Sequence, residues 1–173
     1  MTIFLLTIVL ATDIISGMTR SLQEELRQSR PFPTLEEEVF LELQRTAQVA
    51  MRWVVEALRP VGLSPAQFNV LRILRGARPE ALPSGVIAER MVTRDPDLTR
   101  LLDRLEAAGM VTKARDGRDR RVVNVRITRA GLRAVEDASE AVRQLLQEAL
   151  GPLGRRRLDS LADLLERVRR NSG

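Results

Sequence analysis

The sequence of 173 residues contains no cysteine, no histidine and no tyrosine, and Lys113 is its one lysine. Without cysteine, a disulfide, a thiol redox switch and a cysteine nucleophile are excluded. The absence of histidine likewise excludes a histidine-ligated metal site, a histidine-based triad and an imidazole proton shuttle. A carboxylate-only metal site and a serine–lysine pair stay open. The segment from Gly109 to Lys113 lacks the spacing of a phosphate-binding loop, so we expect no enzyme, no cofactor and no metal.

Residues 1–17 differ from the rest of the chain. Their apolar run from Ile3 to Ala11 is about half the roughly 20 residues that a membrane span needs. A signal peptide requires basic residues before its apolar run, and none precedes this one. Ordinary globular sequence begins after Met18. The leading interpretation is a misassigned start codon, and the alternatives are an arm that packs on a dimer partner and a secretion signal.

The basic residues are concentrated in one segment. The chain is 44% hydrophobic and 29% charged, with a net charge of +5, which is typical of one globular domain with extensions. Codon usage accounts for a general excess of arginine. The segment Lys113–Arg129, however, holds seven basic and two acidic residues, a net of +5. Its charge equals that of the whole chain, which favours a local basic surface.

Two capping boxes predict the first helices. The pattern from Thr34 to Glu37 opens a helix with one apolar stripe that ends at Leu58. The pattern from Ser64 to Gln67, with proline at the first helical position, opens the second helix.

Two shorter helical segments follow. Ser84 is expected to cap a helix over 85–91. Thr93 or Asp95 is expected to cap the next, with Pro96 just inside it and Gly109 just past its end.

After Gly109 the spacing of the apolar residues changes from the helical period of 3.6 to the strand period of 2. Strands are predicted at 111–115 and 123–127, with a hairpin turn signal at Asp116-Gly117. Helices are predicted from about 128 to 150 and from 155 to 170. The apolar sides of the terminal helices indicate a homodimer.

These elements predict a mainly α fold. It is a winged helix-turn-helix with a two-stranded β-hairpin wing and N- and C-terminal dimerisation helices. We assign an N-terminal extension (1–33), an N-terminal dimerisation helix (34–62), a winged helix-turn-helix region (63–128) and C-terminal dimerisation helices (129–173).

Three segments carry a family resemblance. Leu98 to Val111 resembles the recognition helix of MarR-type transcriptional regulators, and Leu63 to Leu71 resembles their second helix. Asp116 to Gly131, with its Asp-Arg-Arg and Thr-x-Ala-Gly patterns, resembles their wing and fifth helix. The resemblance covers about residues 34–170 in the family's order. It implies a cytoplasmic, bacterial winged-helix homodimer on pseudo-palindromic duplex DNA, commonly a repressor that a small ligand relieves.

The resemblance also implies the DNA contacts. The start of a recognition helix reaches base edges in the major groove. Asp97 could complement the helix dipole, which we favour, orient Arg100, or accept from a cytosine amine. The candidate residues on this helix are Arg94, Asp97, Thr99, Arg100 and Arg104.

The wing supplies the second set of DNA contacts. In the family it reaches the adjacent minor groove, where arginine senses a narrow, negative shape. Asp119 and Arg121 match the family's Asp-x-Arg motif, so Asp119 would hold an arginine while Arg118 and Arg120 probe the groove. A solvated basic loop is the alternative. The candidate wing residues are Arg115, Arg118, Asp119, Arg120 and Arg121.

The ligand side gives weaker signals. Met51, Arg52, Trp53 and Phe68 could line an effector pocket, although a lone tryptophan on an amphipathic helix is more often core. The missing cysteine excludes the family's peroxide-sensing mechanism, and the missing histidine argues against zinc sensing. The effector would be a small organic molecule, or there is none. The alternative functions are an architectural or non-specific DNA-binding protein and a winged-helix protein-interaction module.

Overall fold

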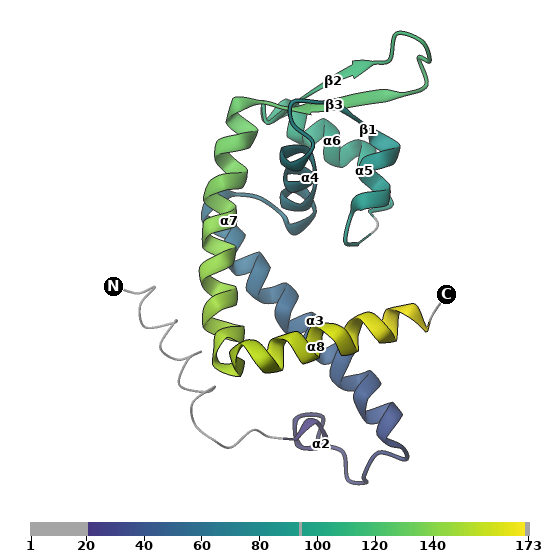
Figure 1. The fold of residues 1–173 in the computed structure, drawn as a ribbon, viewed down its shortest axis with the longest axis vertical. Helices are drawn as coiled ribbons and strands as arrows, with labels where there is room; N and C mark the ends of the chain where they lie inside the picture. Colours follow the sequence, from purple (N-terminus) through teal and green to yellow (C-terminus); the bar gives the residue numbers. More distant parts are fainter. Residues whose placement is uncertain (1–20, 94, 172–173) are drawn as a thin grey trace. The chain divides into compact units, whose positions relative to one another are not determined.

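A computed structural model describes residues 21–93 and 95–171 (Figure 1). The predictions for residues 1–17 and for Arg94 lie outside this part. The elements are, in chain order, α2 (Leu22–Glu25), α3 (Leu35–Leu58), η1 (Arg59–Val61), α4 (Pro65–Gly76), β1 (Leu82–Pro83), α5 (Ser84–Arg90), α6 (Leu98–Ala107), β2 (Val111–Arg115), β3 (Val123–Ile127), α7 (Arg129–Leu150), η2 (Gly151–Leu153) and α8 (Gly154–Arg170).

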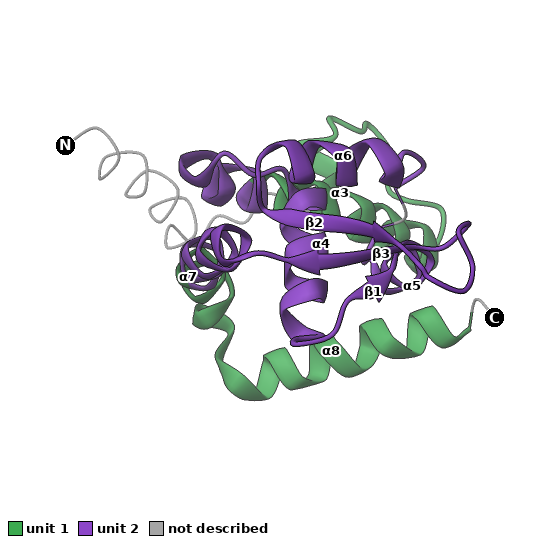
Figure 2. Cartoon of the chain, turned by 90° about the horizontal axis from the view of Figure 1, so that it is seen from above, with its two compact units in different colours: residues 1–52, 144–173 green, residues 53–143 purple. Residues whose placement is uncertain are grey.

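The chain divides into two compact units (Figure 2). The central unit spans residues 53–143, and the terminal unit combines residues 1–52 with 144–173. Helices α3 and α7 contribute to both units. Each unit is described below by itself.

The central unit contains a three-stranded antiparallel sheet in the order β1-β3-β2. Strands β2 and β3 form the predicted hairpin with the predicted bounds, and Val111 lies opposite Ile127. Strand β1, where Leu82 lies opposite Val125, was not predicted. It has two residues, one of them proline, and is too short to show a period. The predicted mainly α fold with a hairpin is confirmed.

The core of the central unit fills the space between this sheet and the helices. Its largest fully buried side chains come from α3, α4, α5, α6, the strands and α7, and include Leu58, Leu71, Leu74, Ile87, Leu105, Val125 and Val135. Helix α4 begins as predicted. The Gln67 N–H donates to Ser64 Oγ at 3.2 Å, and the Ser64 N–H donates to Gln67 Oε1 at 2.9 Å.

Two predicted helix starts are wrong. Helix α6 begins at Leu98, so Pro96 precedes it and its N-cap residue is Asp97 rather than Thr93 or Asp95. The Asp95 carboxylate instead accepts the N–H of Asp97 at 2.8 Å, a local turn that competes with a helix start. Ser84 is the first residue of α5, not its cap.

The regular elements in the described part of the terminal unit are all helices. Helix α3 begins after Thr34, whose Oγ1 accepts the N–H of Glu37 at 3.2 Å, as the first capping box predicts. Apolar side chains on α3 and α8, such as Leu35 and Leu164, stay exposed in the single chain. No helix in residues 21–93 and 95–171 is long and apolar enough to cross a membrane.

Candidate nucleic-acid interface

Helix α6 turns one face to the core and one to solvent. Leu101, Leu102 and Leu105 are buried, while Thr99, Arg100 and Arg104 are exposed. This division follows from the helical spacing of the leucines. The core therefore anchors the helix and leaves its polar face available.

Asp97 lies against Arg100 at the start of α6. Its Oδ2 is 3.3 Å from Arg100 Nε, and the arginine side chain is 78% exposed. A pair this exposed contributes about 0.2–1 kcal/mol, so it orients the guanidinium without immobilising it. The Asp97 side chain makes no capping hydrogen bond. Asp97 could complement the helix dipole, orient Arg100 or accept from a cytosine amine. The contact with Arg100 in the structure supports the second of these roles.

Helix α6 ends at Ala107, and Gly109 lies just past its end, as predicted. Gly109 has φ +68°, a conformation that costs glycine little and other residues more. The Gly109 N–H donates to Glu106 O at 2.8 Å, and the Met110 N–H donates to Leu105 O at 2.9 Å. These two bonds form a Schellman motif. The chain can thus leave the helix directly into β2.

The start of α7 holds this turn in place. Thr128 Oγ1 donates to Gly109 O at 2.7 Å and accepts the Gly131 N–H at 3.1 Å. A Cβ on Gly131 would lie 2.2 Å from Met110 O and 2.9 Å from Ile127 Cγ1. The Thr-x-Ala-Gly pattern therefore allows α7 to approach the end of α6 closely.

Lys113 joins β2 to α6. Its ammonium pairs with Asp103 Oδ1, and with Glu106 Oε2 at 3.0 Å. The Lys113 N–H donates to Glu106 Oε1 at 3.0 Å. The hydrogen bonds to Asp103 and Glu106 raise the pKa of Lys113 above 10.5. Lys113, counted in the basic segment from sequence, serves as a cross-link within the central unit.

The wing loop, residues 116–122, is organised around Asp116. The Asp116 carboxylate accepts the N–H groups of Arg118 at 2.8 Å and Asp119 at 3.2 Å, and Asn124 Nδ2 at 3.0 Å. These bonds hold the pKa of Asp116 below 3.8. The sequence signal at Asp116-Gly117 marked where the chain leaves β2, but the connection is a loop of seven residues, 116–122, and Gly117 does not have the positive φ of a tight hairpin turn. The signal did not indicate the role of Asp116, which depends on a folded loop.

The wing arginines project from this loop. Arg118, Arg120 and Arg121 are exposed, and no ion pair of the described residues involves them. Arg115 Nη1 donates to Arg120 O at 3.2 Å. The Asp119 carboxylate accepts the main-chain N–H of Arg121 at 2.9 Å. The resemblance implied that Asp119 would hold an arginine. In the structure the Asp119 side chain binds the main-chain N–H of Arg121.

The structure brings the two predicted DNA-contact sets into one unit. Thr99, Arg100 and Arg104 lie on α6, the arginines lie on the wing, and Lys113 connects the two elements. Sequence reasoning missed Asp103 and Glu106 as partners of Lys113. Their separation by three residues on one helix face was the available signal.

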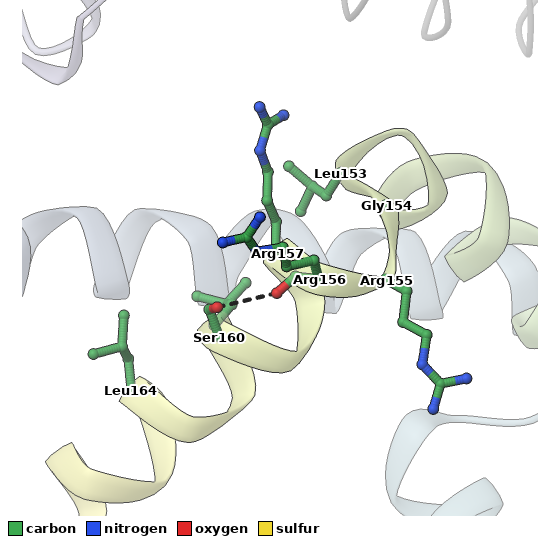
Figure 3. Close-up of a pocket in the computed structure, with 8 residues that line it drawn as sticks. Leu153, Gly154, Arg155, Arg156, Arg157, Ser160 and Leu164 are labelled. Carbon is green, nitrogen blue, oxygen red and sulfur yellow. Dashed lines mark hydrogen bonds between the residues drawn. The ribbon is translucent and has the colours of Figure 1, made fainter.

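The four predicted pocket residues divide between the two units. Phe68 is buried with Arg72 stacked 5.6 Å from its ring centre, and Trp53 is half-buried. Both belong to the central unit, whereas the exposed Met51 and Arg52 belong to the terminal unit. A hollow of about 640 Å³ lies elsewhere, along residues 153–164 of the terminal unit, and includes none of the four (Figure 3).

Comparisons with known proteins agree with this arrangement. The MarR family model matches residues 61–122, from η1 to the end of the wing loop. The crystal structure of a MarR transcription factor from Planctomyces limnophilus is 39% identical, with a TM-score of 0.62 over 79% of this chain and 98% of that chain. The chain belongs to the MarR family. It is thus a member of a family of DNA-binding transcriptional regulators, not of an enzyme family.

Other MarR-family relatives extend the comparison. The regulator FarR of Neisseria gonorrhoeae is 30% identical over 62% of this chain and 73% of its own length. The repressor MdtR of Bacillus subtilis is 31% identical over 54% of this chain, which spans about three fifths (59%) of the repressor. A mutant E. coli MarR complexed with operator DNA is 28% identical, with a TM-score of 0.68 over 78% of this chain and 98% of that chain.

Proposed function

We propose that this MarR-family protein is a homodimer that represses transcription by binding a pseudo-palindromic operator, and that a small organic ligand relieves the repression. Each copy inserts the start of α6 into the major groove and lays its wing against the adjacent minor groove. Arg94, Asp97, Thr99, Arg100 and Arg104 serve the first contact. Arg115, Arg118, Asp119, Arg120 and Arg121 serve the second.

One observation carries this proposal: exposed arginines of α6 and of the wing both project from the central unit, in which Lys113 links the two elements. An α-helix fits the major groove, and arginine binds guanine O6 and N7 through two hydrogen bonds, worth about 1–3 kcal/mol of discrimination. Arg100 is the leading candidate for that contact because Asp97 orients its guanidinium. The related E. coli protein is complexed with operator DNA, which supports operator binding by this chain.

Two considerations support the proposed homodimer. Pseudo-palindromic DNA requires a partner related by a two-fold axis. The terminal unit, moreover, leaves Leu35, Phe40 and Leu164 more than half exposed, and exposed apolar surface of this kind favours association.

Repression and its relief are the finer part of the proposal. The relative named as a repressor supports repression. Trp53, the one tryptophan of the chain, gives a direct test of ligand binding near Met51, Arg52 and Phe68. Aromatic and aliphatic carboxylates, titrated in turn, are expected to change its fluorescence and to release the operator together. A compound that releases DNA without affecting Trp53 would contradict the assignment of this pocket.

The central experiment selects duplexes from a random library with the full chain. We expect recovery of an inverted repeat, bound at least 1,000-fold (~10³) more tightly than random duplex at one salt concentration. Equal affinity for both duplexes would instead support the architectural alternative. Absence of binding to any duplex would support the protein-interaction alternative.

A wing variant identifies the DNA-binding surface. Arg118→Ala/Arg120→Ala should reduce affinity for the repeat and lower the slope of log affinity against log salt by about 0.9 for each phosphate that the variant no longer binds. The control is Arg169→Ala, an exposed arginine in the last turn of α8, which should leave the slope unchanged. A dimer must persist in both variants. Unchanged binding by the wing variant would refute a role for the wing.

A further inference from the structure

One apolar side chain of the central unit stands apart from the core. Val92 is 87% exposed, a larger fraction than that of any other large apolar side chain in residues 21–93 and 95–171. Most of the other exposed apolar side chains lie on α3 and α8, the helices assigned to the proposed homodimer. Val92 instead lies in the loop that joins α5 to α6 (Figure 1). Dimerisation through those helices therefore does not account for its exposure.

The backbone at the end of α5 directs Val92 outward. Met91 is extended, with φ −68° and ψ 137°, and successive side chains of an extended chain point to opposite sides. Because Met91 is buried, the next side chain faces solvent. The Val92 N–H donates to Asn69 Oδ1 at 2.9 Å, which ties this position to α4. The fold thus holds an apolar side chain in the open.

Hydrogen bonds also hold the other end of the loop. Asp95 Oδ1 accepts the Asp97 N–H at 2.8 Å, and Asp97 Oδ2 lies 3.3 Å from Arg100 Nε. Val92 and Arg100 therefore lie on either side of one short segment that leads into α6. In the proposed complex the start of α6 enters the major groove, so this segment is carried to the same groove.

The chemistry of valine limits what it can recognise in DNA. Its side chain neither donates nor accepts a hydrogen bond, so it cannot bind phosphate or the polar edges of the bases. In the major groove the apolar group that a base presents is the C5-methyl group of thymine. A β-branched side chain, moreover, has little χ1 freedom to lose when it makes a contact.

We propose that Val92 packs on the C5-methyl group of a thymine in each half-site of the operator, and that Asn69 positions Val92 for this contact. The thymine lies in the same half-site as the guanine proposed for Arg100. The inference rests on the proposed operator-binding homodimer. It adds a base preference that comes from the loop before α6 rather than from α6 itself.

Exchange of thymine for deoxyuracil tests this contact on the repeat recovered by selection. The exchange removes the methyl group and keeps the hydrogen-bonding edge of the base. Each symmetry-related pair of thymines is exchanged in turn, and fluorescence anisotropy measures the affinity of the full chain. Exchange of one pair should weaken binding about 15-fold, which is about fourfold for each methyl group.

Val92→Ala connects this loss to the side chain. The variant should bind the thymine repeat about as weakly as the natural chain binds the exchanged repeat. Exchange of the same pair should then change its affinity by less than about twofold, because the two changes remove one contact. The control is Val55→Ala, which shortens a valine of α3 that is 43% exposed. This control should retain the loss of about 15-fold on exchange.

Two variants test the positioning role of Asn69. Asn69→Ala removes the acceptor of the Val92 N–H, so the loss on exchange should fall to about threefold or less. Asn69→Asp keeps an acceptor oxygen and should restore the larger loss. The ratio of affinities for the two repeats is the readout, because a new charge that repels both duplexes equally leaves this ratio unchanged. Far-UV circular dichroism checks that each variant is folded.

Several results would overturn the inference. Exchange could cost the natural chain no affinity at any pair, or the loss could persist in Val92→Ala. A Val92→Ala variant that loses affinity equally for the repeat and for random duplex would place this valine on the sugar–phosphate backbone instead. Asn69→Asp that behaves like Asn69→Ala would refute the positioning role. A natural chain that selects no repeat refutes the proposed function itself, which is recognised before any thymine is exchanged.

Discussion

Lys113→Met removes the cross-link between β2 and α6 while keeping a side chain of similar length. In the natural chain the Lys113 ammonium binds Asp103 and Glu106, and its side chain is 21% exposed. The variant leaves two carboxylates of α6 without their cation. Two consequences follow, one for stability and one for DNA binding.

The stability change is modest because both carboxylates are partly exposed. Their side chains are 54% and 42% exposed, and exposed ion pairs contribute about 0.2–1 kcal/mol each. We therefore expect a loss of about 1 kcal/mol and a fall in Tm of about 2–4 °C for a chain of this size. The pKa of Lys113 is raised above 10.5 in the folded state. Its contribution is thus fully present below pH 10.5 and is lost as pH rises through the higher folded value.

The DNA-binding change separates a cross-link from a phosphate contact. Two uncompensated carboxylates on the helix that we propose enters the groove would repel phosphate, so affinity should fall about tenfold. A direct phosphate contact, when removed, lowers the salt slope by about 0.9. Lys113→Met should instead change the slope by well under half that amount. Fluorescence anisotropy on the selected repeat at four salt concentrations measures both quantities.

Neutralising the partners provides the control. Lys113→Met/Asp103→Asn/Glu106→Gln removes the charges that Lys113 compensates, so this triple variant should recover most of the decrease in Tm and affinity. If the triple variant binds DNA as weakly as Lys113→Met, the decrease does not come from uncompensated carboxylates. A slope lowered by a full phosphate contact would likewise refute the assignment of Lys113 as a cross-link.

Two further predictions concern the supports of the interface. Gly131→Ala places a Cβ 2.2 Å from Met110 O and should lower the free energy of unfolding by about 1–3 kcal/mol through overpacking, as measured by urea unfolding. The control is Gly76→Ala, whose Cβ meets nothing within 4 Å. Equal stability of the two variants would contradict the close approach at Gly131. The lowered pKa of Asp116 means that its contribution to wing order is present above pH 3.8 and is lost as pH falls through the lower folded value. Asp116→Asn should therefore speed amide exchange at Arg118 and Asp119 at neutral pH, and protection equal to that of the natural chain would exclude Asp116 as the centre of the loop.

Local signals allowed accurate predictions of the elements. The capping box at Ser64, the glycine after α6 and the change of period at Val111 each depend on neighbours within a few residues. Such interactions form in almost any fold, so the sequence displays them directly. The order of these elements predicted a winged helix, and the family resemblance agreed with that assembly.

Long-range contacts account for what was missed. Strand β1 exists only because β3 offers it an edge, and two residues hold no pattern to indicate it. The start of α6 depends on a competition between the Asp95 turn and helical hydrogen bonds, which capping preference alone does not decide. For Trp53 and its predicted neighbours, helix periodicity assigns each residue to a face of its helix and does not indicate a shared cavity, so the pocket stays a prediction.

The basic segment illustrates how folding redistributes charge that composition merely counts. Its net of +5 included Lys113, whose charge is compensated by two carboxylates of α6 in the folded chain. A compact ammonium with three donors can serve two acceptors at one point, whereas the planar fork of arginine favours one carboxylate or phosphate. In a chain whose other basic residues are all arginine, the one lysine thus occupies the place where a point charge fits best. The charge that faces solvent on the wing belongs to Arg118, Arg120 and Arg121, and these arginines have the geometry suited to nucleic acid.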